Sequence, residues 1–192
     1  ISTTTIYTHV ARERLRAFVR ELLRPALARL GWDASPDETD LTRALRGQLV
    51  QSLAILGADP ETLAQCRELE LEGQGDPQLL QAAVEAVAAE GTRDDLDRYW
   101  ERYRSATTPQ EEERYLFATS RFPGDAEVER ILGASMTDDI RTQDAPYLLA
   151  RSTTNRGQGP KVWRFIAEHW DAMQDRFASS NIIGLVSGIR YL

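Results

Sequence analysis

The sequence predicts an all-α fold, a curved α–α superhelix (solenoid) of about ten helices in a single domain over residues 1–192. Apolar residues recur three or four positions apart along most of the chain. Capping residues, often followed by proline, precede these stretches, and glycines follow them. No segment of useful length alternates apolar and polar residues with period two, so we expect no sheet.

Helix starts are marked by capping residues. The stretch Ser35-Pro36-Asp37-Glu38 predicts a helix with Ser35 at the N-cap and Glu38 closing a capping box. The stretch Thr108-Pro109-Gln110-Glu111 repeats this box. Further starts are expected after Asp59, Asp76, Thr92 and Gly124, and helix ends at Gly31, Gly57, Gly73, Gly91 and Gly157.

Five apolar stripes at helical spacing indicate the helices in chain order. They are Leu15, Phe18, Val19, Leu22, Leu23 and Leu27; Leu41, Leu45, Leu49, Leu53 and Leu56; Leu79, Leu80, Ala83, Val84 and Val87; Leu96, Tyr99, Trp100 and Tyr103; and Val162, Trp163, Phe165, Ile166, Trp170, Met173 and Phe177. After the first two helices the units are short, and short helical hairpins stack as a solenoid by burying their apolar faces on one another. A closed bundle is the alternative, but ten short helices are many for one bundle.

Composition excludes several functions. The single Cys66 and the two distant histidines, His9 and His169, cannot supply the three or four ligands of a zinc centre, so we expect no cofactor and no metal site in this chain. The net charge of −7, with acidic and basic residues interspersed, disfavours nucleic acid as a partner. No apolar run reaches the length of a membrane span, and the first residues do not form a signal peptide, so we expect a cytoplasmic location. Both abrupt ends suggest a piece of a longer protein.

Catalytic motifs of the common hydrolases and nucleotide-binding enzymes are missing, so we expect no catalytic residue. Cys66 lies within a helical pattern and is expected to be a buried apolar side chain. His169 lacks a second histidine at helical spacing and is expected to be structural. The pair Asp138-Asp139 would be the centre of a small all-α enzyme only if both carboxylates faced one site, and a capping role is simpler.

Polar residues gather before and after one helix near the carboxyl end of the chain. They fall into two groups with different expected roles. Gln143, Asp144 and Asn155 are expected to form a structural network that ties a loop to a helix end. Arg141, Arg151 and Arg156 are the alternative, functional group: an arginine facing a cavity could bind a carboxylate through two hydrogen bonds.

The same segment resembles a known family. The stretch Ile140-Arg141-Thr142-Gln143-Asp144, then Asn155 with a glycine after it, then Trp163 and Phe165 with a second tryptophan at Trp170, is similar to the C-terminal helical domain of the aminopeptidase N family of zinc aminopeptidases. Upstream stretches resemble earlier parts of that domain, and the likeness covers roughly residues 10–190. The supporting stretches are Leu30-Gly31-Trp32, Gly91-Thr92 before Tyr99, Trp100 and Tyr103, and Thr108 to Leu116.

The resemblance implies an irregular HEAT-like superhelix that closes over a separate, thermolysin-like catalytic domain and walls a chamber for peptides. In the family, zinc and the catalytic residues belong to that other domain. The chain would therefore be an incomplete, non-catalytic portion of a bacterial aminopeptidase used in peptide catabolism. Its partners would be the catalytic domain of the same polypeptide and peptide substrates. The cut solenoid would expose apolar faces, so we also expect self-association. The rival hypothesis is a stand-alone α-solenoid that binds protein or peptide partners.

Overall fold

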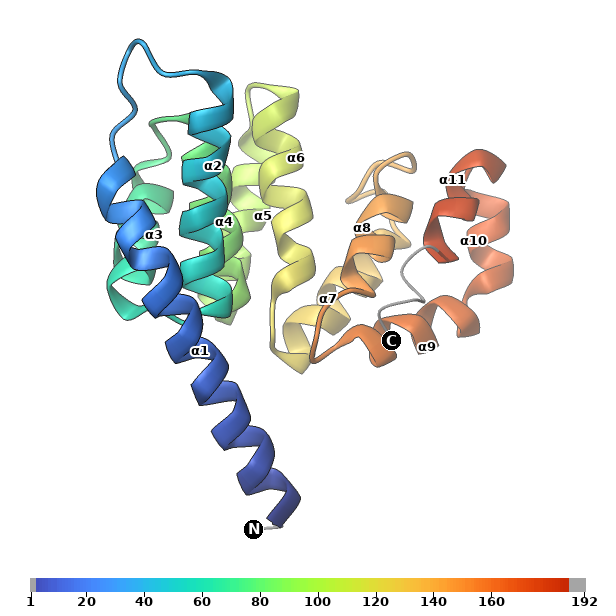
Figure 1. Cartoon of the computed structure of the whole chain (residues 1–192). Coiled ribbons are helices and arrows are strands. Elements are labelled where there is room, and N and C mark those ends of the chain that lie inside the picture. Colours follow the sequence, from blue (N-terminus) through green and yellow to red (C-terminus); the bar gives the residue numbers. More distant parts are fainter. Residues whose placement is uncertain (1–2, 187–192) are drawn as a thin grey trace. The chain divides into compact units, whose positions relative to one another are not determined.

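The computed structural model describes the backbone of residues 3–186 and the side chains of residues 10–186. Within this range the chain forms eleven α-helices, one π-helical turn and one 3-10 turn, and no strand (Figure 1). The all-α prediction is confirmed. The chain divides into two compact units, residues 1–87 and 88–192. None of the helices between residues 3 and 186 combines the length and the apolar content that a bilayer crossing requires.

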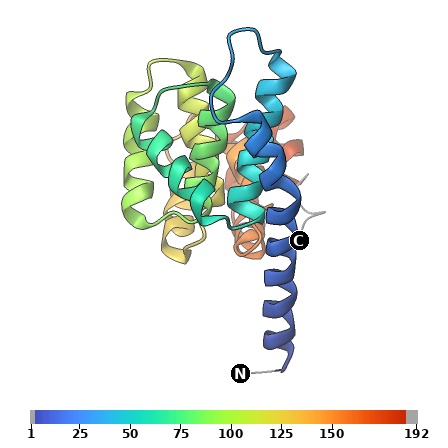
Figure 2. The same ribbon diagram turned by 60° about the vertical axis from the view of Figure 1, so that its left-hand side comes forward.

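The first unit is built from four α-helices and a π-helical turn. They are α1 (Thr3–Leu30), α2 (Asp40–Gln51), η1 (Ser52–Leu56), α3 (Pro60–Glu72) and α4 (Pro77–Ala89), whose last two residues extend past the unit boundary. Figure 2 shows α1 as a long helix whose amino-terminal half projects beyond the other helices of this unit. The core contains Leu27, Leu49, Val50, Leu53, Ala54, Cys66, Leu79, Leu80, Ala83, Val84 and Val87. The stripe that the sequence places on α4 is therefore buried along its whole length.

Most of the expected caps are confirmed. The side chains of Asp59, Thr92 and Thr108 accept hydrogen bonds from the backbone at the starts of α3, α5 (Arg93–Ser105) and α6 (Pro109–Ala118). The Asp76 carboxylate does the same for α4, at 2.9 Å from the Gln78 backbone nitrogen. Gly31 and Gly73 lie in the left-handed region that ends a helix, with φ of 74° and 67°.

The expected helix start at Ser35 is wrong. The stretch Ser35–Glu38 is a turn, in which the Glu38 nitrogen donates to the Ser35 carbonyl at 3.1 Å, and α2 begins at Asp40 after the N-cap Thr39. Glu38 is unavailable for a capping box because its carboxylate binds the guanidinium of Arg46. Arg46 is fully buried, and its Nε also donates to the Gly31 carbonyl at 2.9 Å, so this side chain closes the end of α1.

The apolar stripe of α1 is only partly buried. Leu27 is in the core, whereas Leu15, Phe18 and Leu22 expose 52%, 60% and 60% of their surface. The helical spacing is confirmed. The expectation that the whole stripe packs on neighbouring helices is wrong, because these three side chains lie on a part of α1 that the other described elements of this unit leave uncovered.

The second unit places helix α8 at its centre. Besides α5 and α6 it contains η2 (Thr119–Arg121), α7 (Asp125–Ser135), α8 (Ala145–Ser152), α9 (Gly159–Glu168), α10 (Trp170–Arg176) and α11 (Ser179–Leu185). Helix α8 contacts α6, η2, α7, α9 and α11. The expected end at Gly157 is wrong, because α8 already ends at Ser152 and Gly157 lies in the turn before α9.

An aromatic cluster forms the core of this unit next to the α5–α6 hairpin. The ring of Tyr99 meets the edges of Tyr115 and Phe122, with centroids 5.2 Å and 5.5 Å away. Gly91 lies directly against Phe122: a Cβ atom there would come 2.9 Å from Cδ1 and Cζ of the ring and closer still to Cε1. Only glycine permits this approach of the backbone to the ring.

Candidate functional site

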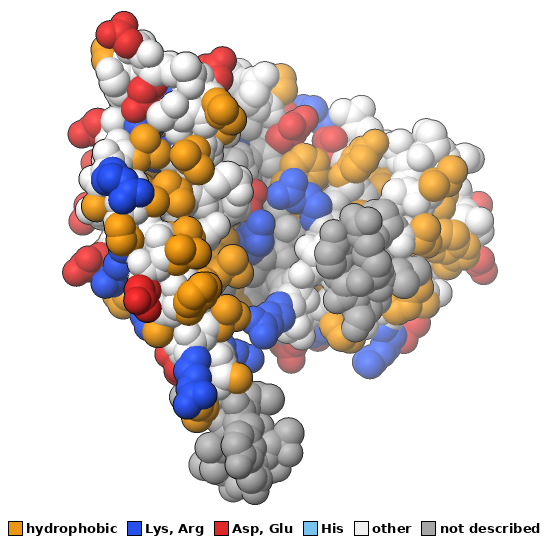
Figure 3. All heavy atoms as spheres, in the orientation of Figure 1, with side chains coloured by type: hydrophobic (Ala, Val, Ile, Leu, Met, Phe, Trp, Pro, Cys, Tyr) orange, Lys and Arg blue, Asp and Glu red, His pale blue; other side chains and the backbone are white. Residues whose placement is uncertain are grey.

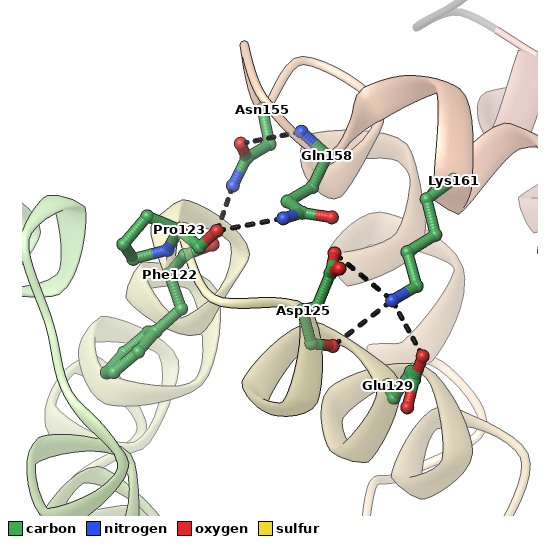
Figure 4. Close-up of polar contacts among 7 residues, drawn as sticks. All are labelled: Phe122, Pro123, Asp125, Glu129, Asn155, Gln158 and Lys161. Carbon is green, nitrogen blue, oxygen red and sulfur yellow. Dashed lines mark hydrogen bonds and ion pairs between the residues drawn. The ribbon is translucent and has the colours of Figure 1, made fainter.

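The turn between α8 and α9 is tied to the segment between α6 and α7 by side chains from both of its ends (Figure 4). The carboxamide nitrogen of Asn155 donates to the carbonyls of Ser120 at 2.9 Å and Phe122 at 3.0 Å. Its oxygen accepts from the backbone nitrogens of Gly157 at 3.1 Å and Gln158 at 3.2 Å. Asn155 thus uses both donors and its acceptor, and it fixes the turn in one conformation.

Two further side chains extend this connection. The side-chain nitrogen Nε2 of Gln158 donates to the Pro123 carbonyl at 2.8 Å. The Nζ of Lys161 lies 2.7 Å from the Glu129 carboxylate and 3.3 Å from that of Asp125, at the start of α7. The contact with Glu129 raises the pKa of Lys161, and hydrogen bonds from Gln158 and then Lys161 lower the pKa of Asp125. This lysine joins the amino-terminal turns of α7 and α9.

The three residues of the predicted polar network have different surroundings. The partners of Asn155 are the backbone carbonyls of Ser120 in η2 and of Phe122, the residue after η2. Asp144 occupies the residue before α8, where burial raises the pKa of its carboxyl, with Arg141 opposing this shift and Glu112 adding to it. Gln143 is exposed in the turn that precedes Asp144. The sequence carries no signal for the contacts of Gln158 and Lys161, although Lys161 is the only lysine in the chain.

The three candidate arginines have three different environments. Arg141 forms an ion pair with Glu112 of α6 at 2.8 Å. The guanidinium of Arg151, at the end of α8, lies over the ring of Phe117, 5.4 Å from its centroid. Arg156 is exposed in the turn that Asn155 holds. Arg156 therefore presents its charge to solvent from a fixed backbone.

The two other candidate reactive residues with described side chains, Cys66 and His169, are held by packing and by a helix end. Cys66 is fully buried, and burial raises the pKa of its thiol to about 12, so the reactive thiolate is suppressed at neutral pH. The ring of His169 stacks on Phe165, and its Nδ1 lies 2.9 Å from the Phe165 carbonyl. The side chain of His9 lies outside the described residues.

The adjacent carboxylates of Asp138 and Asp139 have different partners. Asp138 pairs with Arg176 at 3.0 Å and Asp139 with Arg104 at 3.8 Å, so the adjacent carboxylates contact arginines of two different helices. Among the residues with described side chains, no group of three or more His, Cys, Asp or Glu is placed to hold a metal ion. The side chains around the α8–α9 turn fix helix ends and leave Arg156 exposed to solvent.

Comparison with known families identifies the chain. The model of the ERAP1-like C-terminal domain matches residues 2–190. The chain belongs to this family. The match runs across both compact units.

Similar curated proteins carry aminopeptidase names. Over 168 residues the chain is 28% identical to aminopeptidase M1 of Arabidopsis thaliana, covering 82% of this chain and 19% of that protein. It is 26% identical over 187 residues to aminopeptidase M1-A of Oryza sativa subsp. japonica, covering 91% of this chain and 21% of that protein. Over 185 residues it is 26% identical to endoplasmic reticulum aminopeptidase 1 of Homo sapiens, covering 91% of this chain and 19% of that protein. The chain therefore spans about a fifth of the length of these relatives.

Proposed function

We propose that the chain is the non-catalytic C-terminal portion of a zinc aminopeptidase, and that it shapes and gates the chamber through which peptides reach the catalytic domain of the same polypeptide. The full-length enzyme would remove N-terminal amino acids from peptides. The observation that carries the proposal is the family match over residues 2–190, in a chain that spans about a fifth of relatives named aminopeptidases.

The proposal assigns zinc and the catalytic residues to the catalytic domain, outside residues 1–192. The helical units described above would supply a wall and a surface, and Arg141, Lys161 and Asp95 are among the ionisable groups held in ion pairs or helix caps. Residues 1–192 are taken as one helical-repeat domain. The bacterial origin, the cytoplasmic location and the role in peptide catabolism expected from the sequence belong to the same proposal.

Arg156 is the arginine best suited to attract the C-terminal carboxylate of a long peptide. Arg141 shares its charge with Glu112, and the guanidinium of Arg151 lies against Phe117. Arg156 stands exposed in a turn that Asn155 fixes, so ordering it costs little backbone entropy. A guanidinium so placed can bind a carboxylate through two hydrogen bonds.

The test is the dependence of kcat/KM on peptide length in the full-length enzyme carrying Arg141→Ala, Arg151→Ala or Arg156→Ala. We expect Arg156→Ala to lower kcat/KM for long peptides about 2- to 5-fold, the size of an exposed charge contact, and to leave single-residue substrates unchanged. The control is Arg130→Ala, which removes an exposed arginine that pairs with Asp97. An unchanged length dependence in all three variants would contradict this role of the arginines.

A further inference from the structure

An apolar surface of the first unit is left open to solvent. It is formed by Leu15, Phe18 and Leu22 on α1 and by Leu41 and Leu45 on α2, which expose between 52% and 80% of their surface. We call this surface the α1–α2 face. Helices α1 and α2 contact each other, and apolar side chains gather over both of them in Figure 3. Large apolar side chains at helical spacing on neighbouring helices are the usual form of a helix-docking surface.

The charge around this face restricts what can cover it. Between Val10 and Leu30, α1 carries six arginines and two glutamates, and of these arginines Arg16 pairs with Glu13 and Arg24 with Asp59. Arg12 and Arg14, both exposed, lie one helical turn before Leu15 and Phe18. A covering element with acidic flanks would complement this basic border.

A second copy of the chain is a poor match. Two α1–α2 faces packed together would bring two arginine-rich borders into contact, and like charges in an interface are unfavourable. The covering element is better sought in the rest of the polypeptide. Four fifths of each aminopeptidase relative lies outside the part that this chain matches.

We propose that the α1–α2 face docks a helix of the same polypeptide from outside residues 1–192, with apolar residues three or four positions apart and acidic residues along its edges. This inference rests on the parent enzyme of the proposed function. The contact would bury Phe18 and Leu22 and would hold α1 against its own polypeptide. It is separate from the exposed arginine of the α8–α9 turn and from any step of peptide hydrolysis.

The test uses the accessibility of a thiol placed on the face. Leu22→Cys is introduced into the parent enzyme and into the 192-residue chain, and the rate of maleimide labelling at each cysteine is followed by peptide mass spectrometry. Cys66 is a silent background in the native state because it is buried. The matched control is Glu68→Cys, exposed on α3. We expect the thiol at position 22 to react at least ten times more slowly in the parent than the thiol at position 68, and the two to react alike in the 192-residue chain.

The possible outcomes distinguish a helix of the same polypeptide from a second copy of the chain as the partner of the α1–α2 face. Equal rates at positions 22 and 68 in the parent would overturn the proposal. A 192-residue chain that sediments as a dimer with position 22 protected would also overturn it, in favour of a second copy. Labelling of Cys66 would report that the isolated chain has unfolded, and the comparison within the parent then decides alone. None of these readouts measures activity, so their failure leaves the proposed function standing.

The charge part of the proposal has its own test. Arg12→Glu combined with Arg14→Glu is added to the Leu22→Cys parent. If acidic flanks cover the face, the reversed charges weaken the contact, and labelling at position 22 accelerates about fivefold or more in the parent and stays unchanged in the isolated chain. A parent rate that does not change would overturn the assignment of an acidic partner helix.

Discussion

The carboxamide nitrogen of Asn155 lies 2.9 Å from the carbonyl oxygen of Ser120, a residue 35 positions earlier in the chain. The same nitrogen reaches the Phe122 carbonyl, and the oxygen accepts from two backbone nitrogens of its own turn. One side chain therefore satisfies four backbone groups, two in the segment between α6 and α7 and two in the turn before α9. The turn that carries Arg156 gets its fixed shape from this residue.

Replacing Asn155 by alanine removes all of these hydrogen bonds at once. We expect Asn155→Ala to lower the free energy of unfolding by about 1–3 kcal/mol, because carbonyls that are partly shielded from water lose their donors. Urea unfolding followed by circular dichroism measures this. The comparison is Gln158→Ala, which removes an exposed bond to the Pro123 carbonyl and a hydrogen bond to the exposed carboxylate of Asp125. An equal loss in both variants would show that Asn155 is not the central connector.

Gly91 tests how tightly the aromatic cluster is packed. Gly91→Ala places a methyl group inside van der Waals contact with the Phe122 ring, so we expect thermal unfolding to show a loss of about 1–3 kcal/mol. Phe122→Leu, added to this variant, should cost less than it does in the wild type, because it makes room for the methyl group.

The matched control for Gly91 is Gly133 in α7. A Cβ atom there would meet nothing within 4 Å. Gly133→Ala should leave stability unchanged or raise it by up to about 1 kcal/mol, since alanine is the better helix former. A Gly91→Ala variant as stable as Gly133→Ala would contradict the close packing of Phe122.

Asp59 is expected to make stability depend on pH. Its carboxylate is buried, which disfavours the charge, but hydrogen bonds from Thr62 and Arg24 outweigh this and hold its pKa below the ordinary value of 3.8. A group with a lowered pKa in the folded state stabilises above its ordinary pKa, and this contribution is lost as pH falls through the folded value. The stability advantage of the wild type over Asp59→Asn should therefore be largest near pH 7 and shrink below about pH 4.

Asn at position 59 is a good N-cap, so Asp59→Asn keeps the start of α3 and mainly removes the charge. The pH series of urea unfolding is repeated with Asp97→Asn, whose exposed pair with Arg130 is screened by solvent. This second variant should show the smaller pH dependence. A constant difference between wild type and Asp59→Asn from about pH 3 to about pH 7 would rule out the role given to the charge.

The sequence was sufficient to predict the helices and most of their starting residues. Asp59, Thr92 and Thr108 cap helices as predicted because an N-cap is a local interaction between residues three positions apart. Ser35 has the same local pattern, yet Glu38 binds the buried Arg46 instead of closing a capping box. Local propensity could not reveal this contact, because it depends on where α1 and α2 pack.

The candidate site, like the helix starts, could be predicted only in part from the sequence. The sequence pointed to Asn155 and to Arg141, Arg151 and Arg156, but not to the partners of Asn155, because they are backbone carbonyls that carry no sequence signal. The burial of α1 could not be predicted either. Its stripe has regular helical spacing, and only the placement of the neighbouring helices shows that Leu27 is covered and Phe18 is not.

The central claim is that residues 1–192 are a non-catalytic part of a zinc aminopeptidase. The most direct measurement is the sequence of the reading frame upstream of Ile1. We expect it to encode, in frame, a His-Glu-x-x-His motif with a further glutamate after it, the residues that would bind zinc and catalyse the reaction. A start codon shortly before Ile1, with no such motif in the same frame, would contradict the claim and favour a stand-alone helical scaffold.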